Sequence, residues 1–307
     1  MKSSRSISLG IVIIVLFFGI LAISTGSILV RLATTEAEVR SLGFSLVMSA
    51  ARLTFAALLL LPSWGKIQWR SLQPGAVLFA CLAGMTLTFH FATWITSLSY
   101  TSIAASTTLV TTTPIWVALI SWIWLKQKPT KLTSLGIIIA LGGGILIAIA
   151  DSSPGVANPN PTLGNILALI GAITASFYLM LGREAQQRGF QLGGYITVAY
   201  SLAAILLLPL PTLFNTSYIG YPNIVYFYLF LMAVLPQLVG HTSLNWGMNH
   251  VSPTIVALMT LCEPVGSSIL GYFFFQEIPS FLVIIGAIVI LIGVAIAVLG
   301  SQAKTQL

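Results

Sequence analysis

The sequence has very little charge. Of its 307 residues, 6% are Asp, Glu, Lys or Arg, 57% are hydrophobic, and the mean hydropathy is +1.00. An ordinary soluble domain is about 25% charged, so this chain cannot cover a water-exposed surface with polar groups. Its polar stretches are short, which leaves no room for a separate soluble domain. Any function must therefore lie in the part of the protein within the bilayer.

Cysteines and catalytic motifs are also scarce. Cys81 and Cys262 are the only cysteines, and both lie in apolar runs, which argues against a disulfide framework or a zinc knuckle. The chain has no glycine-rich phosphate loop followed by lysine and no His-Glu-x-x-His pattern. We therefore expect no enzyme, no ATP-driven pump, and neither a metal ion nor a cofactor.

Long apolar runs dominate what is present. About 20 apolar residues are needed to cross a bilayer as a helix, and such runs predict an all-α membrane protein with ten transmembrane helices. The first run follows Lys2 and Arg5 but is too long for the apolar part of a signal peptide, so we expect an uncleaved first helix. The runs lie near residues 7–30, 43–62, 74–97, 101–125, 132–150, 163–181, 192–212, 223–245, 252–275 and 280–300.

Basic residues fall unequally in alternate loops. With a cytoplasmic N-terminus, ten of the 13 Lys and Arg residues lie in cytoplasmic segments and only Arg31 and Arg40 in outer ones. Because short loops rich in Lys and Arg stay in the cytoplasm, we expect a multi-pass protein of the cell (inner) membrane with both termini cytoplasmic. The same asymmetry accounts for the net charge of +7 without a nucleic-acid partner.

The chain divides into two related halves. A polar linker at residues 151–162 separates a first five-helix repeat, 1–150, from a second repeat with a short tail, 163–307. Because each half has an odd number of crossings, the second enters from the opposite side, giving an inverted-topology repeat typical of alternating-access carriers. A shift of 150 positions places Ser102 on Ser252, Pro114 on Pro264, Pro129 on Pro279, Gly136 on Gly286 and Gly143 on Gly293.

Two charged residues lie inside predicted helices. Arg52 is near the centre of the second helix, and Glu263 is in the ninth, directly before Pro264. Inserting a charge at the middle of the bilayer costs roughly 2.5–3.5 kcal/mol on insertion scales. Each of these charged residues is therefore expected to have a structural or functional role. Either could bind a charged group of a substrate, the two could pair, or Glu263 could carry a coupling proton. Arg52 could also extend to the membrane interface.

Aromatic and histidine side chains offer a further set of candidates. His90 and Trp94 share one face of the third helix, and His241 and Trp246 occupy the comparable part of the eighth. These four could line a central cavity or, for the histidines, serve only as interhelical hydrogen-bond partners.

The helix-breaking and small residues suggest how a cavity could form. Pro114 and Pro264 each free a carbonyl group one turn earlier, which can face a cavity or simply kink the helix. The threonines of 107–113 could provide a polar path, or return their hydroxyls to helix carbonyls. Close helix packing is expected at Gly142, Gly143, Gly144, Gly286 and Gly293.

These residues resemble the EamA family of the drug/metabolite transporter superfamily. Glu263-Pro264-Val265, followed by an apolar run to Gln276-Glu277, is similar to the signature of the family's second repeat, and Arg52 with Leu53, Ala56 and Ala57 resembles its second helix. The resemblance covers the chain from the first helix to Gly300. It departs from the family at Lys126-Gln127-Lys128, because the first repeat of many relatives ends its fourth helix with an acidic residue. In addition, Thr113 stands where the second half has a Glu before its proline.

The resemblance implies a secondary transporter that exports small metabolites such as amino acids or related compounds through a central cavity. We expect its partners to be a small-molecule substrate and the lipid bilayer, with proton coupling as an option, and its state to be a monomer or weak homodimer. The alternatives are a membrane-embedded enzyme acting on lipids and a sensor or scaffold that moves nothing. The substrate-binding or cavity-lining candidates are Arg52, His90, Trp94, His241, Trp246 and Glu263.

Overall fold

The computed structural model describes residues 8–101, 103–150, 160–276 and 281–302, so most of the predicted linker at 151–162 lies outside the described residues. The described part of the chain is helical and contains no strand. Its first half comprises α1 (Leu9–Ala37), α2 (Leu42–Leu59), α3 (Ala76–Tyr100), α4 (Ile103–Val110), α5 (Thr113–Leu125) and α6 (Lys131–Ala150), with 3₁₀ turns at Leu61–Lys66 and Trp69–Ser71.

The second half repeats this order with more interruptions. A π-helical segment joins two α-helices, and a 3₁₀ turn joins two others. Its elements are α7 (Pro161–Gln187), α8 (Leu192–Leu207), α9 (Leu210–Leu213), α10 (Asn223–Met232), the π-helical segment (Ala233–His241), α11 (Thr242–Gly247), α12 (Pro253–Met259), the 3₁₀ turn (Thr260–Cys262), α13 (Glu263–Phe275) and α14 (Phe281–Gln302).

Seven helical spans in the described residues are long and apolar enough to cross a membrane. They match the predicted first, second, third, sixth, seventh, eighth and ninth helices. The other three predicted helices correspond to shorter apolar helices, Thr113–Leu125, Lys131–Leu146 and Ile284–Ala297. The all-helical membrane class is therefore confirmed, whereas the number ten stays a prediction.

Two helices are broken at equivalent places in the two halves. The chain leaves α-helical geometry between α4 and α5, and again at the 3₁₀ turn between α12 and α13. Pro114 and Pro264 occupy the first turn of α5 and α13, where a missing N–H costs nothing. Both helices then end at a left-handed residue, Lys126 (φ 57°) and Gln276 (φ 55°), which again are 150 positions apart.

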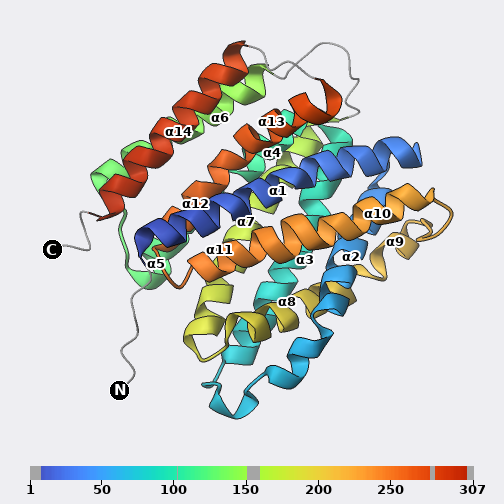
Figure 1. Ribbon diagram of the computed structural model, residues 1–307, viewed down its shortest axis with the longest axis horizontal. Helices are drawn as coiled ribbons and strands as arrows, with labels where there is room; N and C mark the ends of the chain where they lie inside the picture. The colour runs from blue at the N-terminus through green and yellow to red at the C-terminus, as the bar shows by residue number, and fades with distance from the viewer. Residues whose placement is uncertain (1–7, 102, 151–159, 277–280, 303–307) are drawn as a thin grey trace.

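Helices α6 and α14 pack backbone to backbone along one edge of the molecule (Figure 1). A Cβ atom built on Gly143 would lie 2.6 Å from the carbonyl oxygen of Gly286, and one on Gly293 would lie 2.5 Å from the Ala140 nitrogen. Both lie below ordinary van der Waals contact, so these positions admit only glycine. Gly142, by contrast, has nothing within 4 Å and takes no part in this contact.

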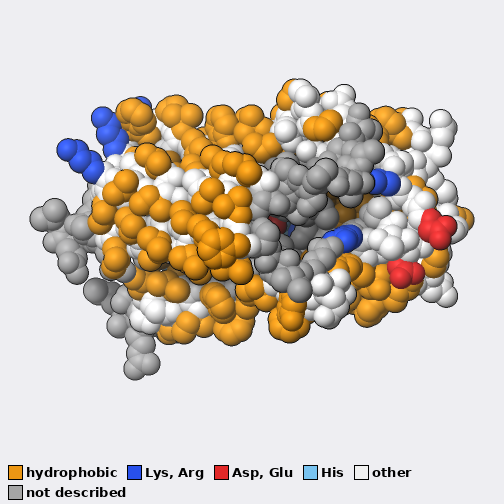
Figure 2. Space-filling model, turned by 90° about the horizontal axis from the view of Figure 1, so that it is seen from above, with side chains coloured by type: hydrophobic (Ala, Val, Ile, Leu, Met, Phe, Trp, Pro, Cys, Tyr) orange, Lys and Arg blue, Asp and Glu red, His pale blue; other side chains and the backbone are white. Residues whose placement is uncertain are grey.

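The surface has the character of a membrane-embedded protein. Figure 2 shows hydrophobic side chains over much of one face, with basic side chains at one end and both basic and acidic ones toward the other. Helix α1 runs the length of the molecule across its front in Figure 1, packing on α10, the π-helical segment and α13. It thereby connects the first half of the chain to the broken helices of the second.

Candidate functional site: a central cavity between the two halves

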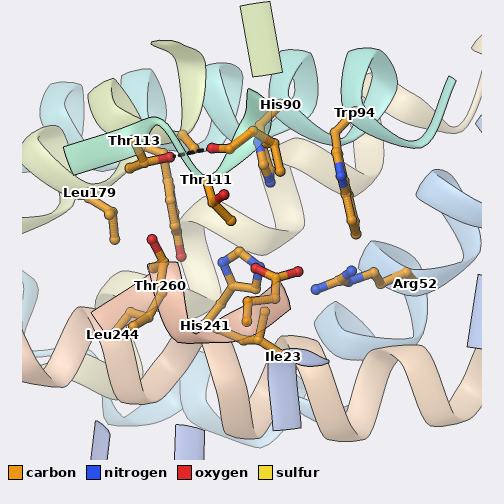
Figure 3. Close-up of a pocket in the computed structure, with 14 residues that line it drawn as sticks. Ile23, Arg52, His90, Trp94, Thr111, Thr113, Leu179, His241, Leu244 and Thr260 are labelled. Atoms are coloured by element: carbon orange, nitrogen blue, oxygen red, sulfur yellow. Dashed lines mark hydrogen bonds between the residues drawn. The ribbon is translucent and has the colours of Figure 1, made fainter. Parts of the chain in front are cut away.

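A cavity lies at the centre of the molecule, lined by residues of both halves (Figure 3). Its walls come from α1, α2, α3, α7, the π-helical segment and α11, and from the two helix breaks. Five of the six predicted substrate-binding or cavity-lining residues meet here, although they are far apart in the sequence: Arg52, His90, Trp94, His241 and Glu263.

Arg52 lies on α2 and is 1% exposed. Its Nε donates a hydrogen bond of 2.9 Å to Oε1 of Gln237, and its guanidinium carbon lies 4.1 Å from the centre of the Phe91 ring. The predicted alternative of extension to the interface is wrong, because the side chain is held inside by these two contacts. Figure 3 shows the guanidinium directed into the cavity.

The histidines face each other across the cavity. Nδ1 of His90 lies 2.9 Å from the Gly171 carbonyl oxygen, so this nitrogen carries the hydrogen and donates it. The His90 ring lies parallel to Trp94 at 6.0 Å and 6.1 Å from the His241 ring. His241 comes from the last turn of the π-helical segment, which begins three residues before Pro236. Such wide turns often occur at functional sites.

Trp246 does not line this cavity. It lies one turn further along α11, where its ring stacks on His250 at 4.0 Å. The lining residue of α11 is instead Leu244, because the π-helical turn rotates the following residues relative to a regular helix. The predicted pair His241 and Trp246 is therefore split between two places.

Glu263 begins α13 and is 7% exposed. Its carboxylate lines the cavity but forms no ion pair with Arg52 and no hydrogen bond within the described part of the chain. In the first half the equivalent position is Thr113, which also lines the cavity and whose hydroxyl donates 2.8 Å back to the Val110 carbonyl. One repeat thus contributes a carboxylate where the other contributes a hydroxyl that is already bonded.

The threonines of 107–113 mostly bond their own helix. Thr111 and Thr112 donate to the carbonyls of Thr107 and Leu109 at 2.8 and 2.7 Å, the back-bonding pattern typical of membrane helices. Among the described side chains of this run, Thr111 and Thr113 line the cavity. The Thr108 side chain lies outside what the structure describes.

A buried polar cluster lies between the cavity and the α7–α8 loop. Nδ2 of Asn245 donates to the hydroxyl of Tyr178 at 2.5 Å, and Gln186 Nε2 donates to the Asn245 carbonyl at 3.2 Å. Asn249 in turn donates 2.8 Å to Oε1 of Gln186. These bonds tie α7 to α11 and to the turn that follows α11.

We expect Asn245→Leu to lower the free energy of unfolding by about 1 kcal/mol, because interhelical hydrogen bonds in membranes average somewhat less and reach nearly twice that value. Thermal or denaturant unfolding in detergent would measure the change. Combining it with Tyr178→Phe should give less than the sum of the two single losses. Strictly additive losses would mean that the short bond contributes nothing.

Sequence reasoning missed two side chains that organise the site. Gln237, on the π-helical segment, orients Arg52, and its signal was a lone amide beside Pro236 in an otherwise apolar run. Tyr178 lines the cavity and is 1% exposed. A tyrosine in a membrane helix is common, so only the three-dimensional structure could single it out.

The cavity holds polar groups but no metal-binding cluster. In the part of the chain that the structure describes, no group of three or more His, Cys, Asp or Glu residues could hold a metal ion. What the arrangement can do is bind a small molecule between a cationic side chain, a carboxylate and aromatic rings.

Comparison with known proteins identifies the two halves. Residues 10–149 and 162–299 each match the model of the EamA-like transporter family. One relative, the uncharacterized transporter YyaM of Bacillus subtilis, is 25% identical over 235 residues, covering 75% of this chain and 76% of that protein. An uncharacterized transporter of Archaeoglobus fulgidus is 23% identical over 221 residues, covering 69% and 72% of the two chains.

The fold is also found in a solved structure. A protein described only by its crystal structure superposes with a TM-score of 0.75 at 17% sequence identity, covering 97% of this chain and 99% of its own. At this identity the likeness shows the fold alone.

Proposed function

Because the chain belongs to the EamA-like transporter family of the drug/metabolite transporter superfamily, we propose that this membrane transporter is an alternating-access secondary carrier that exports small metabolites such as amino acids. One observation supports it above the others. A cavity between two repeats of the same family domain contains Arg52 and Glu263, two buried charges that do not pair with each other. Buried charges without a partner are expensive, and a site for a transported solute accounts for both.

The inverted repeat gives this cavity its proposed motion. Each half carries a helix broken just before Pro114 or Pro264, and these two breaks meet at the cavity. Unwound backbone near the midplane binds substrates in carriers built from such repeats. We propose that rocking of residues 1–150 against 163–307 opens the site to each side in turn.

Flux without ATP is the test of this function. Purified protein in liposomes should move one or more solutes from a panel of radiolabelled amino acids and metabolites down their gradients, with and without an imposed pH gradient. Protein-free liposomes are the control. Saturable binding of a solute with no flux of any panel member would instead favour a sensor or scaffold.

The proposed orientation makes a separate prediction. In a variant lacking Cys81 and Cys262, a cysteine placed at Asn158 should react in intact cells with a maleimide that cannot cross membranes. A cysteine placed at Lys128 should react only after the cells are opened, since basic loops are retained inside. Equal labelling of both, or the reverse order, would contradict cytoplasmic termini.

A further inference from the structure

Three nitrogen atoms lining the cavity have no hydrogen-bond partner: Nη2 of Arg52, Nε1 of Trp94 and Nδ1 of His241. Arg52 and Trp94 are 1% and 4% exposed, so water outside the protein does not solvate them. Figure 3 shows all three side chains directed toward the same space. Buried polar groups are nearly always bonded in folded proteins, and three unpartnered nitrogens around one cavity therefore indicate a ligand.

The chemistry of these atoms defines what the ligand carries. A guanidinium always bears its charge and donates in a planar fork, and an indole nitrogen is a donor only. Two of the three atoms can thus bond only an acceptor, and one belongs to a cation. Carboxylates and other oxyanions fit this set, because charge-assisted bonds to arginine are short and strong.

The Arg52 guanidinium is held in place for such a ligand. Gln237, 0% exposed, accepts from Nε, and the Phe91 ring lies against the guanidinium face. Neither group is a counter-charge. The nitrogen left without a partner is therefore fixed in direction, and no carboxylate of the described residues bonds the guanidinium directly.

The rest of the lining is largely apolar. Ile23, Leu179 and Leu244 contribute hydrocarbon surface beside the aromatic rings of Trp94 and Tyr178. A small organic molecule with an apolar body and one anionic end would match both parts of the cavity.

We propose that the Arg52 end of the cavity is an oxyanion-binding subsite for a small organic carboxylate, in competition with the Glu263 carboxylate for the charge of Arg52. This rests on the proposed function, since it assigns what the carrier's cavity binds. Two negative charges beside one guanidinium repel each other. Occupation of the subsite therefore displaces or neutralises Glu263, and His90, His241, Tyr178 and Tyr200 are the other titratable groups that surround this charge pair.

Benzoate and benzamide provide a matched test, because they share a shape and differ in charge. Equilibrium dialysis of radiolabelled benzoate against the purified protein should show saturable binding, with benzamide competing about tenfold or more weakly. Arg52→Gln should abolish benzoate binding, and Arg52→Lys should retain part of it. Glu263→Gln should tighten binding several-fold, because it removes the competing charge. His250→Gln, a change outside the cavity, should leave binding unchanged.

Folding of each variant is checked by size-exclusion elution and thermal unfolding, so a lost fold cannot pass for a lost site. Inorganic phosphate is the second probe. If phosphate displaces benzoate and the binding of phosphate requires Arg52, the subsite accepts tetrahedral oxyanions as well. Equal binding of benzoate and benzamide, or benzoate binding that survives in folded Arg52→Gln, overturns the proposal, as does absence of Arg52-dependent binding of both probes.

The outcome is separable from the proposed function. Arg52-dependent benzoate binding with no flux of any solute in liposomes would support the oxyanion subsite and contradict the proposal that the protein is a carrier. Flux of solutes without any Arg52-dependent binding of an oxyanion would support the proposed carrier function and contradict the oxyanion subsite.

Discussion

Replacing Glu263 with glutamine is expected to slow solute flux in liposomes about tenfold or more, a change of roughly 1.4 kcal/mol in the barrier, while the protein remains folded. Glutamine keeps the size of the side chain and removes its charge. Glu263 is buried, lines the cavity and begins α13 beside Pro264. Its position at a helix break lets a change in its charge act directly on the part of the chain proposed to move.

The measurement is the initial rate of uptake of a solute identified in the liposome screen, with benzoate binding measured on the same preparation. We expect slower flux together with undiminished binding, which separates movement from recognition. Glu184→Gln supplies the matched control, because Glu184 lies near the end of α7 and bonds Arg188 at 3.1 Å outside the cavity. Flux at the wild-type rate in folded Glu263→Gln would remove Glu263 from the mechanism.

Gly143→Leu is expected to disrupt the packing of α6 on α14 and to lower the free energy of unfolding by about 3 kcal/mol, the upper part of the range for overpacking. The atoms that a side chain would meet are the backbone oxygen of Gly286 and the backbone nitrogen of Ile290, at 2.6 and 2.8 Å. Backbone atoms cannot move aside as a flexible side chain can. The two helices would have to separate, with loss of dispersion contacts along their length.

Gly142→Leu is the control for this prediction, one residue away in the same helix. A Cβ there has nothing within 4 Å, so the change adds one apolar side chain without a clash. Thermal unfolding in detergent should place Gly142→Leu near the wild type and Gly143→Leu well below it. Equal stability of the two variants would show that the α6–α14 contact does not require glycine at Gly143.

The helices could be predicted from the sequence because their cause is local. An apolar run with polar breaks has no other low-energy conformation in a bilayer, where every backbone group must be bonded within the segment. The runs near 7–30, 192–212 and 223–245 coincide with helical spans Leu9–Ala37, Leu192–Leu213 and Asn223–Gly247. The first extends seven residues beyond the prediction, since polar residues at its C-terminal end do not stop a helix.

Only some of the residues that form the site could be predicted from the sequence. Arg52 and Glu263 stood out because charge within an apolar run is rare. Gln237 and Phe91, which hold Arg52, carry no comparable signal and meet it only through contacts across long stretches of chain. His241 and Trp246 lie in the same part of the eighth predicted helix, but after the π-helical turn the Trp246 ring stacks on His250 instead of lining the cavity.

The sequence by itself determined that the chain is a helical membrane protein built from two halves of one family, because composition, apolar run length and the 150-residue offset are properties of the chain alone. Only the tertiary structure decided that Arg52, His90, Trp94, His241 and Glu263 share one cavity. The physical reason is that the free energy of burying a charge depends on the groups that surround it. Which nitrogen finds a partner, and which is left facing an open space, is fixed when helices from both halves pack together.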